Sequence, residues 1–299
     1  MNSPVRSLSI ATTKPKEVNT RRKGKRRKTL ALALGGGGAR SLAQVVVIDA
    51  LDELGVRPVA IAGTSCGALI GAACAAGMSG KAIRRSVLKI AHDRNAIYSR
   101  LMSARAGRVA ELLSSPIGNP LLIDSEKFCA SFLPADIPES FSDLKIPLTV
   151  LATDLHGRRE VAFTTGALRP AVAASMAIPG LMSPVEIEGT VYVDGAAVNP
   201  LPFDCVADRA DVILAVDCSG GPVEGTGVPG PWEALFATLQ VMIDGIVAEK
   251  LRRATPDLLI RPNVSLFGMF DFFQASAIMR VAGPVKEEVK SKLIQLLAL

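Results

Sequence analysis

The sequence predicts an α/β domain with a mainly parallel central sheet, and three observations support this. Apolar runs of strand length alternate along the chain with stretches of helical periodicity. Some runs, such as TLALAL at 29–34 and DVILAV at 211–216, are almost wholly apolar, which is typical of strands buried on both faces. Hydrophobic residues make up 49% of the 299 residues, enough for a substantial core. Parallel strands joined by crossover helices account for all three observations.

The expected strands are short apolar runs. The first two span 29–34 and 59–63, and the second is entered through Pro58. Five more runs follow at 147–153, 160–165, 190–193, 211–216 and 257–260. Because turn residues closely bound EVAFTT (160–165) and TVYV (190–193), we expect these two to be antiparallel additions to the sheet.

The expected helices lie between and after these strands. Residues 40–54 have helical spacing and end before Gly55, a helix stop signal, and a second helix runs from Ser65 toward Gly77. Further helical patterns are found near 79–92, 168–178, 232–253 and 284–298. The stretch 219–230, with five glycines and two prolines, predicts a loop.

The charge is concentrated at the N-terminus. Residues 1–28 carry ten Lys or Arg against one acid, a local charge of +9, so the rest of the chain sums to −3. This composition predicts a disordered basic N-terminal arm at 1–28 before a folded domain at 29–299. We expect a solvated arm, with peripheral contact with an anionic membrane as the alternative. Nucleic acid is not expected, because aromatic residues are only 4% of the chain and no basic stripe continues into the domain.

Cysteine and histidine usage bounds the chemistry. The odd number of cysteines and the absence of a CxxC pair argue against a disulfide framework and a cysteine zinc site. The cysteines are Cys66, Cys74, Cys129, Cys205 and Cys218. The two histidines, His92 and His156, are too far apart in sequence to form a close metal-binding pair. We therefore expect free thiols in a reducing, cytoplasmic compartment, and neither a metal nor a cofactor.

Two segments imitate targeting signals. The run RRKGKRRK at 21–28 precedes only about six apolar residues, fewer than the roughly 7 to 15 of a signal peptide. Residues 59–78 have the length of a membrane span, but most of them are Ala or Gly, which contribute little insertion energy. We expect a strand, a sharp turn and a tightly packed helix there.

Gly63-Thr64-Ser65-Cys66-Gly67 is a GxSxG element between an apolar strand and a helix of small residues. At such a turn, a serine lies at a helix N-terminus in a strained conformation and the next N–H, that of Cys66, points at the same space. Ser65 is thus a candidate nucleophile. The alternative is a chance match in which Ser65 only caps the helix.

A glycine loop supplies a second candidate element. Gly35-Gly36-Gly37-Gly38-Ala39-Arg40 opens a helix and presents free N–H groups at its positive end. Dinucleotide binding is the rival interpretation, but Ser41 replaces the third glycine of the GxGxxG spacing, and no Walker lysine follows. We expect these N–H groups to hold the oxyanion of a tetrahedral intermediate. Arg40 either fixes the loop or meets substrate charge.

The group that takes the serine proton has to be found elsewhere in the chain. No histidine follows residue 156; His156 is expected in a turn, and His92 at the exposed end of a helix. Asp194, in the sequence Tyr192-Val193-Asp194-Gly195-Ala196, ends a strand at a tight turn and is the candidate base. Its alternative role is a turn-forming aspartate.

Together these pieces resemble the patatin-like phospholipase family, specifically its compact, stand-alone bacterial type. The resemblance covers essentially residues 29–299, and its ordered motifs make it more specific than GxSxG alone. The motifs are GGGGAR (35–40), IAGTSCGALIGAACAAG (61–77), AASMAIPGLMSP (173–184), VYVDGAAVNPLP (191–202) and DLLIRPNV (257–264). The chain departs from the family pattern at Ser41, where glycine is usual, and in DGA in place of DGG.

The resemblance implies a three-layer α/β/α fold and a Ser-Asp dyad, with Ser65 as nucleophile and Asp194 as base. It also implies an oxyanion hole, which we assign to Gly36, Gly37, Gly38, Ala39, Arg40 and Cys66. We expect a serine acyl hydrolase that cleaves fatty-acyl esters of phospholipids, lysophospholipids or related lipids through an acyl-enzyme. Because an ordinary Asp is a weak base, its site has to be partly desolvated. The alternative is a catalytically silent lipid-binding or regulatory protein on the same fold.

Overall fold

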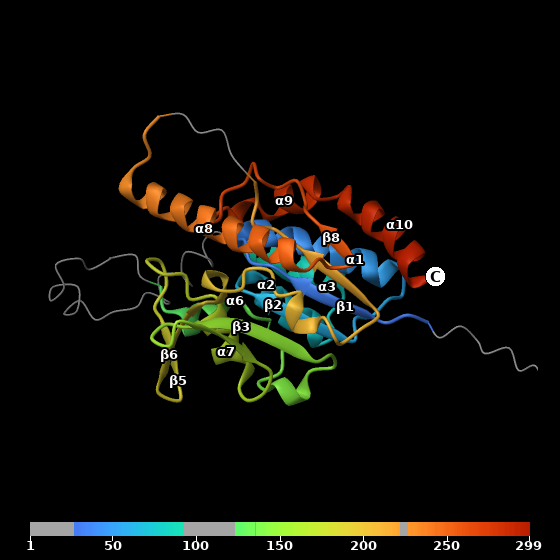
Figure 1. Ribbon diagram of the computed structural model, residues 1–299, viewed down its shortest axis with the longest axis horizontal. Helices are drawn as coiled ribbons and strands as arrows, with labels where there is room; N and C mark the ends of the chain where they lie inside the picture. The colour runs from blue at the N-terminus through green and yellow to red at the C-terminus, as the bar shows by residue number, and fades with distance from the viewer. Residues whose placement is uncertain (1–26, 93–122, 135, 222–226) are drawn as a thin grey trace, which may run out of the picture.

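The computed structural model describes residues 27–92, 123–134, 136–221 and 227–299. Eight strands of these residues form one sheet in the order β5-β6-β3-β2-β1-β7-β8, and β4 pairs with β3 (Figure 1). The strands are β1 (Leu30–Leu34), β2 (Ala60–Thr64), β3 (Leu148–Asp154), β4 (Arg159–Phe163), β5 (Val185–Ile187), β6 (Thr190–Asp194), β7 (Val212–Val216) and β8 (Leu258–Ile260).

The central strands run parallel. β1 pairs in parallel with β2 and β7, β2 with β3, and β7 with β8. The other three strands, β4, β5 and β6, pair antiparallel. The predicted mainly parallel sheet with antiparallel strands near 160–165 and 190–193 is therefore confirmed. The sequence analysis does not predict β5, because its three residues are too few to show a strand pattern.

The predicted helices are all found, with small shifts at their ends. The α-helices of the described residues are α1 (Gln44–Glu53), α2 (Cys66–Ala75), α3 (Gly80–His92), α6 (Ser125–Phe132), α7 (Leu168–Ser175), α8 (Pro231–Arg253), α9 (Ala275–Val281) and α10 (Val285–Leu297). The helix expected over 40–54 is divided, because its first turn is the 3₁₀ helix η1 (Gly38–Ala43) and the α-helix begins at Gln44. The short helices α6 and α9 are additional.

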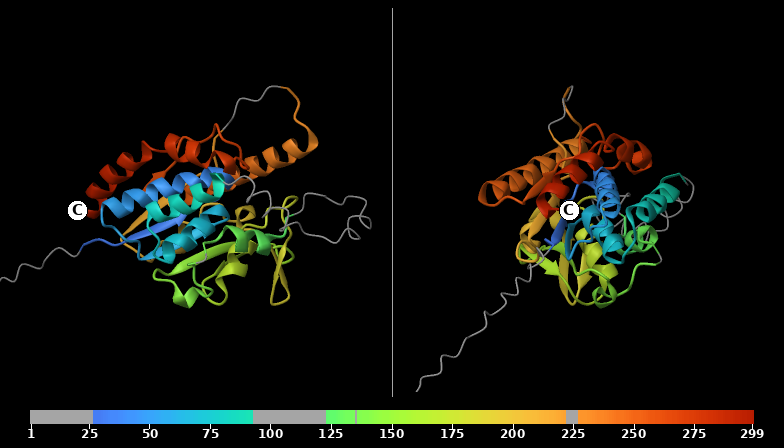
Figure 2. Two further views of the ribbon diagram at one scale, coloured as in Figure 1. Left: turned by 180° about the vertical axis from the view of Figure 1, so that it is seen from behind. Right: turned by 90° about the vertical axis from the view of Figure 1, so that its right-hand side faces the viewer.

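Alternating side chains of β1 build two cores, one on each face of the sheet. Its leucines pack on the face that α1 and α10 cover, together with residues such as Ile48 and Leu293. Its alanines face a thinner layer that includes Phe203 and Val247 of α8. The right-hand view of Figure 2 shows α8 (orange) on one side of the sheet and α1 to α3 (blue to cyan) on the other. The predicted three-layer α/β/α fold is confirmed.

The two segments that imitate targeting signals have different outcomes. Residues 59–78 contain strand β2 and helix α2, as expected, and not a membrane span. Within the described part of the chain, no helix combines the length and apolar character that crossing a bilayer requires. The basic arm expected at 1–28 lies outside the described residues except for its last two, Arg27 and Lys28, which are exposed.

Candidate active site

Ser65 occupies a sharp turn between the end of β2 and the start of α2. Its backbone has φ 55° and ψ −130°, a strained conformation for a residue with a side chain. The turn brings α2 so close to β1 that a Cβ on Gly67 would collide with the carbonyl oxygen of Leu34. The predicted strand, sharp turn and helix are therefore present, and the glycine is required by a close backbone approach.

Asp194 faces Ser65 from another part of the sheet. It ends β6 and lies opposite Ala152 of β3, and its side chain is buried. The Ser65 Oγ donates a hydrogen bond of 2.7 Å to the Asp194 Oδ2. The other carboxylate oxygen, Oδ1, accepts the N–H of Ala196 at 2.8 Å. The structure thus brings together two candidate residues that are far apart in sequence.

Burial sets the ionisation of the groups at this turn. Desolvation raises the pKa of Asp194 to about 6, even though the hydrogen bonds from Ala196 and Ser65 act to lower it. Burial, together with the charge of Asp194, raises the pKa of the Cys66 thiol to about 12. At neutral pH the carboxyl is therefore a carboxylate of enhanced basicity, and the neighbouring thiol stays protonated.

Two of the N–H groups expected in the oxyanion hole, those of Gly36 and Ala39, are already used by the protein itself. The Gly36 N–H donates to the carbonyl oxygen of Pro200 at 2.9 Å, and the Ala39 N–H donates to that of Met269 at 2.8 Å. These bonds tie the loop to the segment after Asp194 and to the segment before α9. Neither group is free to meet a substrate oxygen in this conformation.

The N–H groups of Gly37 and Gly38 are arranged differently. Both residues have positive φ, and a Cβ on Gly38 would collide with the carbonyl oxygen of Met269. Their N–H groups come before the first N–H that is bonded within the 3₁₀ helix η1. Among the loop and turn hydrogen bonds of the described residues, neither Gly37 nor Gly38 is a backbone donor. Both residues line the same pocket as Ser65.

The side chain of Arg40 holds the glycine loop in place through hydrogen bonds. The guanidinium is buried, its Nε donates to the Gly37 carbonyl oxygen at 3.3 Å, and its Nη2 donates to the Gln240 Oε1 at 2.6 Å. Burial lowers the pKa of Arg40 from its ordinary value. Gln240 belongs to α8, so the arginine links the loop to that helix. Of the two predicted roles for its side chain, this geometry supports fixing the loop.

The end of α7 contacts the backbone of both candidate residues. The Ser65 N–H donates to the Ser175 Oγ at 2.9 Å, and that hydroxyl donates to the carbonyl oxygen of Leu151. Two residues further, the Ala177 carbonyl oxygen accepts the Asp194 N–H at 3.0 Å. This segment belongs to the motif at 173–184, but nothing local in its sequence indicates that Ser175 contacts Ser65.

A pocket of about 80 Å³ opens beside Ser65 and Asp194. Helix α8, which the sequence analysis does not connect with the site, contributes a large part of its wall. The lining residues are Gly36, Gly37, Gly38, Ser65, Ile178, Pro179, Asp194, Ala196, Ala197, Ser219, Phe236, Leu239, Gln240, Ile243 and Met269. Apart from the candidate dyad, most of the lining is apolar.

The two histidines weighed from the sequence do not line this pocket. His92 is at the exposed end of α3 and His156 is in the exposed turn between β3 and β4, as expected. All five cysteines are free. In the part of the chain that the structure describes, His, Cys, Asp and Glu side chains form no group of three or more suited to a metal.

Comparison with known proteins gives consistent matches. The family model "Patatin-like phospholipase" matches residues 32–206. An uncharacterized NTE family protein of Mycobacterium bovis is 36% identical over 192 residues, which are 64% of this chain and 49% of that protein. Patatin-like phospholipase domain-containing protein 7 of Rattus norvegicus is 32% identical over 191 residues, which are 63% of this chain and 13% of that protein.

A solved structure, VipD from Legionella pneumophila, aligns with a TM-score of 0.47 and 15% identity, over 89% of this chain and 67% of that one. The chain spans about half the length of the Mycobacterium relative. Since the family model covers more than half of the chain, the chain belongs to the patatin-like phospholipase family.

Proposed function

We propose that this protein is a serine acyl hydrolase that cleaves fatty-acyl esters of phospholipids, lysophospholipids or related lipids. The observation that carries the proposal is the 2.7 Å hydrogen bond from the Ser65 Oγ to the Asp194 Oδ2, made at the wall of an apolar pocket. Membership of the patatin-like phospholipase family supports the same reaction class.

In the first half of the reaction, Ser65 acts as the nucleophile. Its Oγ attacks the ester carbonyl carbon while Asp194 takes the hydroxyl proton, and a tetrahedral intermediate forms. The carbon–oxygen bond to the leaving alcohol then breaks, and Asp194 gives the proton to that alcohol. The raised pKa of Asp194, about 6, suits a group that accepts and returns a proton near neutral pH.

In the second half, water replaces the alcohol. The water oxygen attacks the acyl-enzyme carbonyl carbon while Asp194 takes a proton from the water. The bond between the acyl carbon and the Ser65 Oγ then breaks, and Asp194 passes the proton to that Oγ. The products are a fatty acid and the regenerated serine. No other titratable side chain is needed, and the two histidines lie away from the pocket.

The oxyanion of each tetrahedral intermediate needs hydrogen-bond donors. Of the six residues expected in the oxyanion hole, Gly37 and Gly38 carry the N–H groups best placed for it, since Gly36 and Ala39 donate within the protein. The N–H of Cys66, the first residue of α2, adds the positive end of a helix. A donor of this kind stabilises a transition state by roughly 2.7 to 4 kcal/mol.

The pocket's size and lining support an acyl ester as substrate. Its volume of about 80 Å³ is small beside the roughly 300 to 1,000 Å³ of sites that enclose a whole drug-sized ligand. It accommodates the reacting ester, whereas a long acyl chain has to continue past the apolar residues of α8, such as Phe236 and Ile243.

The test is a Ser65→Ala variant assayed on phospholipids, lysophospholipids and acylglycerols, with labelling by a serine-reactive fluorophosphonate. We expect loss of both hydrolysis and labelling in a folded protein. The matched control is Ser219→Ala, which removes the other serine hydroxyl lining the pocket and should leave labelling in place. Labelling that survives in Ser65→Ala but not in Ser219→Ala would identify Ser219, and not Ser65, as the nucleophile. A wild-type protein that binds lipid but hydrolyses none of the panel would favour the silent lipid-binding alternative.

A further inference from the structure

Helix α8 has a composition that does not match its exposure. Of its 23 residues, Pro231–Arg253, only Val247 is buried. Yet between 231 and 248 its charged residues are only Glu233 and Asp244, and most of the others are apolar. A helix that is apolar on most of its surface is normally covered by protein or by lipid.

The exposed apolar side chains of the protein gather around this helix. Eight of the thirteen large hydrophobic side chains exposed in the described residues lie within 228–273. We call four of them, Trp232, Leu235, Met242 and Phe270, the mouth surface; they are 56%, 42%, 59% and 42% exposed. Scattered apolar residues are normal on a protein surface, but a local concentration marks an interaction site.

The mouth surface is continuous with the pocket that holds Ser65. Phe270 packs edge-on against Phe236, a pocket-lining residue, with ring centroids 5.1 Å apart. Trp232 and Leu235 lie over Gly180, which follows the pocket-lining Pro179.

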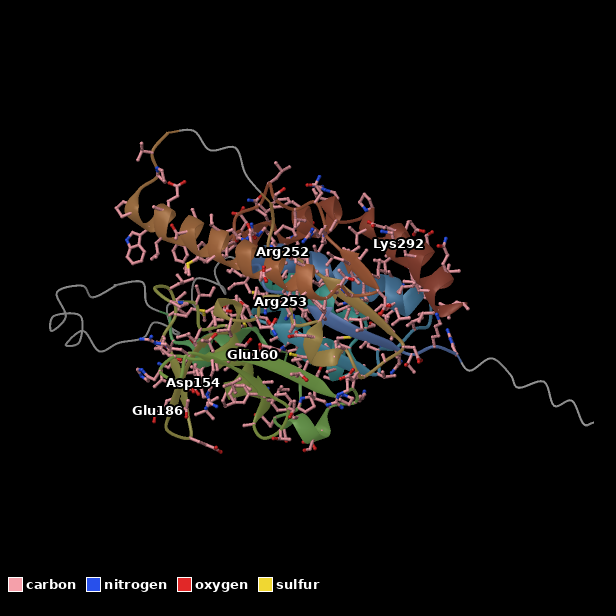
Figure 3. All side chains as sticks on the ribbon, viewed as in Figure 1. Asp154, Glu160, Glu186, Arg252, Arg253 and Lys292 are labelled. Atoms are coloured by element: carbon pink, nitrogen blue, oxygen red, sulfur yellow. The ribbon has the colours of Figure 1, made fainter. Side chains whose placement is uncertain are left out.

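The orientation of α8 separates this surface from the charged part of the helix. In Figure 1 the N-terminal half of α8 extends past the ends of β1 and β8, toward the side of the molecule where β5 and β6 lie. Figure 3 labels Arg252 and Arg253, which belong to the opposite end of the helix and lie over the body of the protein. In the two stretches that carry the mouth surface, 228–243 and 265–273, the charged residues are Glu233 and Asp271, and neither stretch contains Lys or Arg.

We propose that the mouth surface docks on a zwitterionic lipid surface, so that the pocket opens directly onto the acyl chains. The choice of a lipid as occupant rests on the proposed function, because the surface continues a pocket assigned to lipid esters. The lack of Lys and Arg in these two described stretches favours an electrically neutral interface over an anionic one. An apolar flank of α8 buried at the boundary of head groups and acyl chains would let a chain leave the bilayer without crossing water.

The chain contains its own probe for this docking, because Trp232 is its only tryptophan. The full-length protein is titrated with vesicles of diether phosphatidylcholine, which has no ester to cleave. We expect a blue shift of Trp232 emission that persists at about 1 M salt, where charges are screened beyond roughly 3 Å. Leu235→Asp and Met242→Asp should each weaken vesicle binding at least about tenfold, since they place a charge in the buried flank.

The matched controls are Val281→Asp on α9 and Ile294→Asp on α10, which add the same charge at exposed apolar positions away from the mouth surface. They should bind vesicles as the wild type does. Binding confined to anionic vesicles and lost in salt would overturn the proposal. A second result would also overturn it: without vesicles, the blue shift grows with protein concentration, and sedimentation shows a dimer that Leu235→Asp dissociates. The mouth surface would then bind a second copy of the chain and not a lipid surface.

The docking and the proposed reaction can fail separately. Turnover of a water-soluble short-chain ester should be nearly unchanged in Leu235→Asp and absent in Ser65→Ala, whereas vesicle binding should show the reverse pattern. If the protein docks on vesicles but hydrolyses no ester, the docking proposal is supported and the proposed function is wrong. If the protein hydrolyses esters but all the variants bind vesicles equally well, only the docking proposal is wrong.

Discussion

The backbone N–H of Ser65 donates to the hydroxyl of Ser175 across 2.9 Å, although 110 positions separate the two residues. Ser65 has a positive φ, and such strain persists only where the surroundings hold it. Ser175 is fully buried, so its hydroxyl supplies the partner that water cannot. The contact connects the last residue of α7 directly to the candidate nucleophile.

We therefore expect Ser175→Ala to slow the reaction through misplacement of Ser65. The variant leaves the Ser65 N–H without an acceptor, and a displacement of about 1 Å at a reacting group can cost about a hundredfold in rate. The expected result is a fall of roughly 10- to 100-fold in kcat for a soluble short-chain ester, with KM nearly constant. The pH dependence of the remaining activity should be that of the wild type, since Asp194 is untouched.

Ser125→Ala is the matched control for this variant. Ser125 is also a buried serine whose hydroxyl donates to a carbonyl oxygen, that of Ser183, and it lies at the start of α6 away from the pocket. Both variants should lower the melting temperature by a few degrees. If the two lose equal stability and both keep full kcat, Ser175 has only a structural role.

The second prediction concerns the histidines. His92 and His156 are exposed and line no part of the pocket, so the double variant His92→Ala, His156→Ala should keep most of its ester hydrolysis. Steady-state kinetics on a soluble ester, with a melting curve to confirm folding, measures this. A folded but inactive histidine-free protein would assign the base to a histidine and contradict the role of Asp194.

The third prediction is the pH profile. A general base works as its deprotonated form, and burial raises the pKa of Asp194 to about 6. Below that pH, kcat/KM for a soluble ester should fall about tenfold per unit, and above it the value should level off. A profile that stays flat down to about pH 4, the ordinary pKa of an Asp, would show that the pKa of Asp194 is not raised in the folded protein.

The sequence predicts the sheet and the turn at Ser65 because their signals are local. The alternation of leucine and alanine in β1 encodes two buried faces. The GxSxG spacing encodes the turn at Ser65. These patterns depend only on neighbours in the chain, so they can be recognised before the fold is known. The pattern Asp194-Gly195 by itself is typical of a turn aspartate, and Asp194 is singled out as the base only by the lack of a suitable histidine and by the family resemblance.

The remaining parts of the site depend on contacts between distant segments. Helical spacing predicts α8, but nothing local indicates that Gln240 of that helix meets Arg40 of the glycine loop, 200 positions away. Likewise, only the structure reveals that Pro200 and Met269 occupy two of the loop N–H groups expected to be free. The sequence therefore does not indicate which loop N–H groups are bonded within the protein, and it does not indicate that α8 forms a wall of the pocket.

A fourth prediction follows from the departure at Ser41. This residue is fully buried, and its hydroxyl has no hydrogen-bond partner among the described residues. A buried hydroxyl without a partner costs about 1 to 3 kcal/mol. Ser41→Ala should therefore raise the free energy of unfolding, measured in urea, by about 1 kcal/mol. A loss of stability would indicate that the hydroxyl makes a hydrogen bond, for instance to an ordered water.

The last prediction separates chemistry from stability at Asp194. Asn keeps the shape of the side chain and can still accept the Ala196 N–H, but it cannot take a proton. Asp194→Asn should therefore lose roughly two to four orders of magnitude in rate. The same variant should be more stable than the wild type at neutral pH, because the wild type buries a carboxylate that desolvation disfavours. At 1.36 kcal/mol per pKa unit, the rise from 3.8 to about 6 sets an upper limit of about 3 kcal/mol.

The size of this stability difference changes with pH in a defined way. Between about pH 4 and 6 the folded wild type binds more protons at Asp194 than the unfolded chain does, so the contribution of Asp194 to stability falls as pH rises through this window. Asn has no such dependence. Urea unfolding should therefore give the two proteins nearly equal free energies of unfolding near pH 4. The advantage of Asp194→Asn should grow as the pH rises to about 6 and stay constant above that pH. A gap that is absent at every pH would mean that Asp194 is not desolvated in the folded protein, and its role as a base of raised pKa would fall with it.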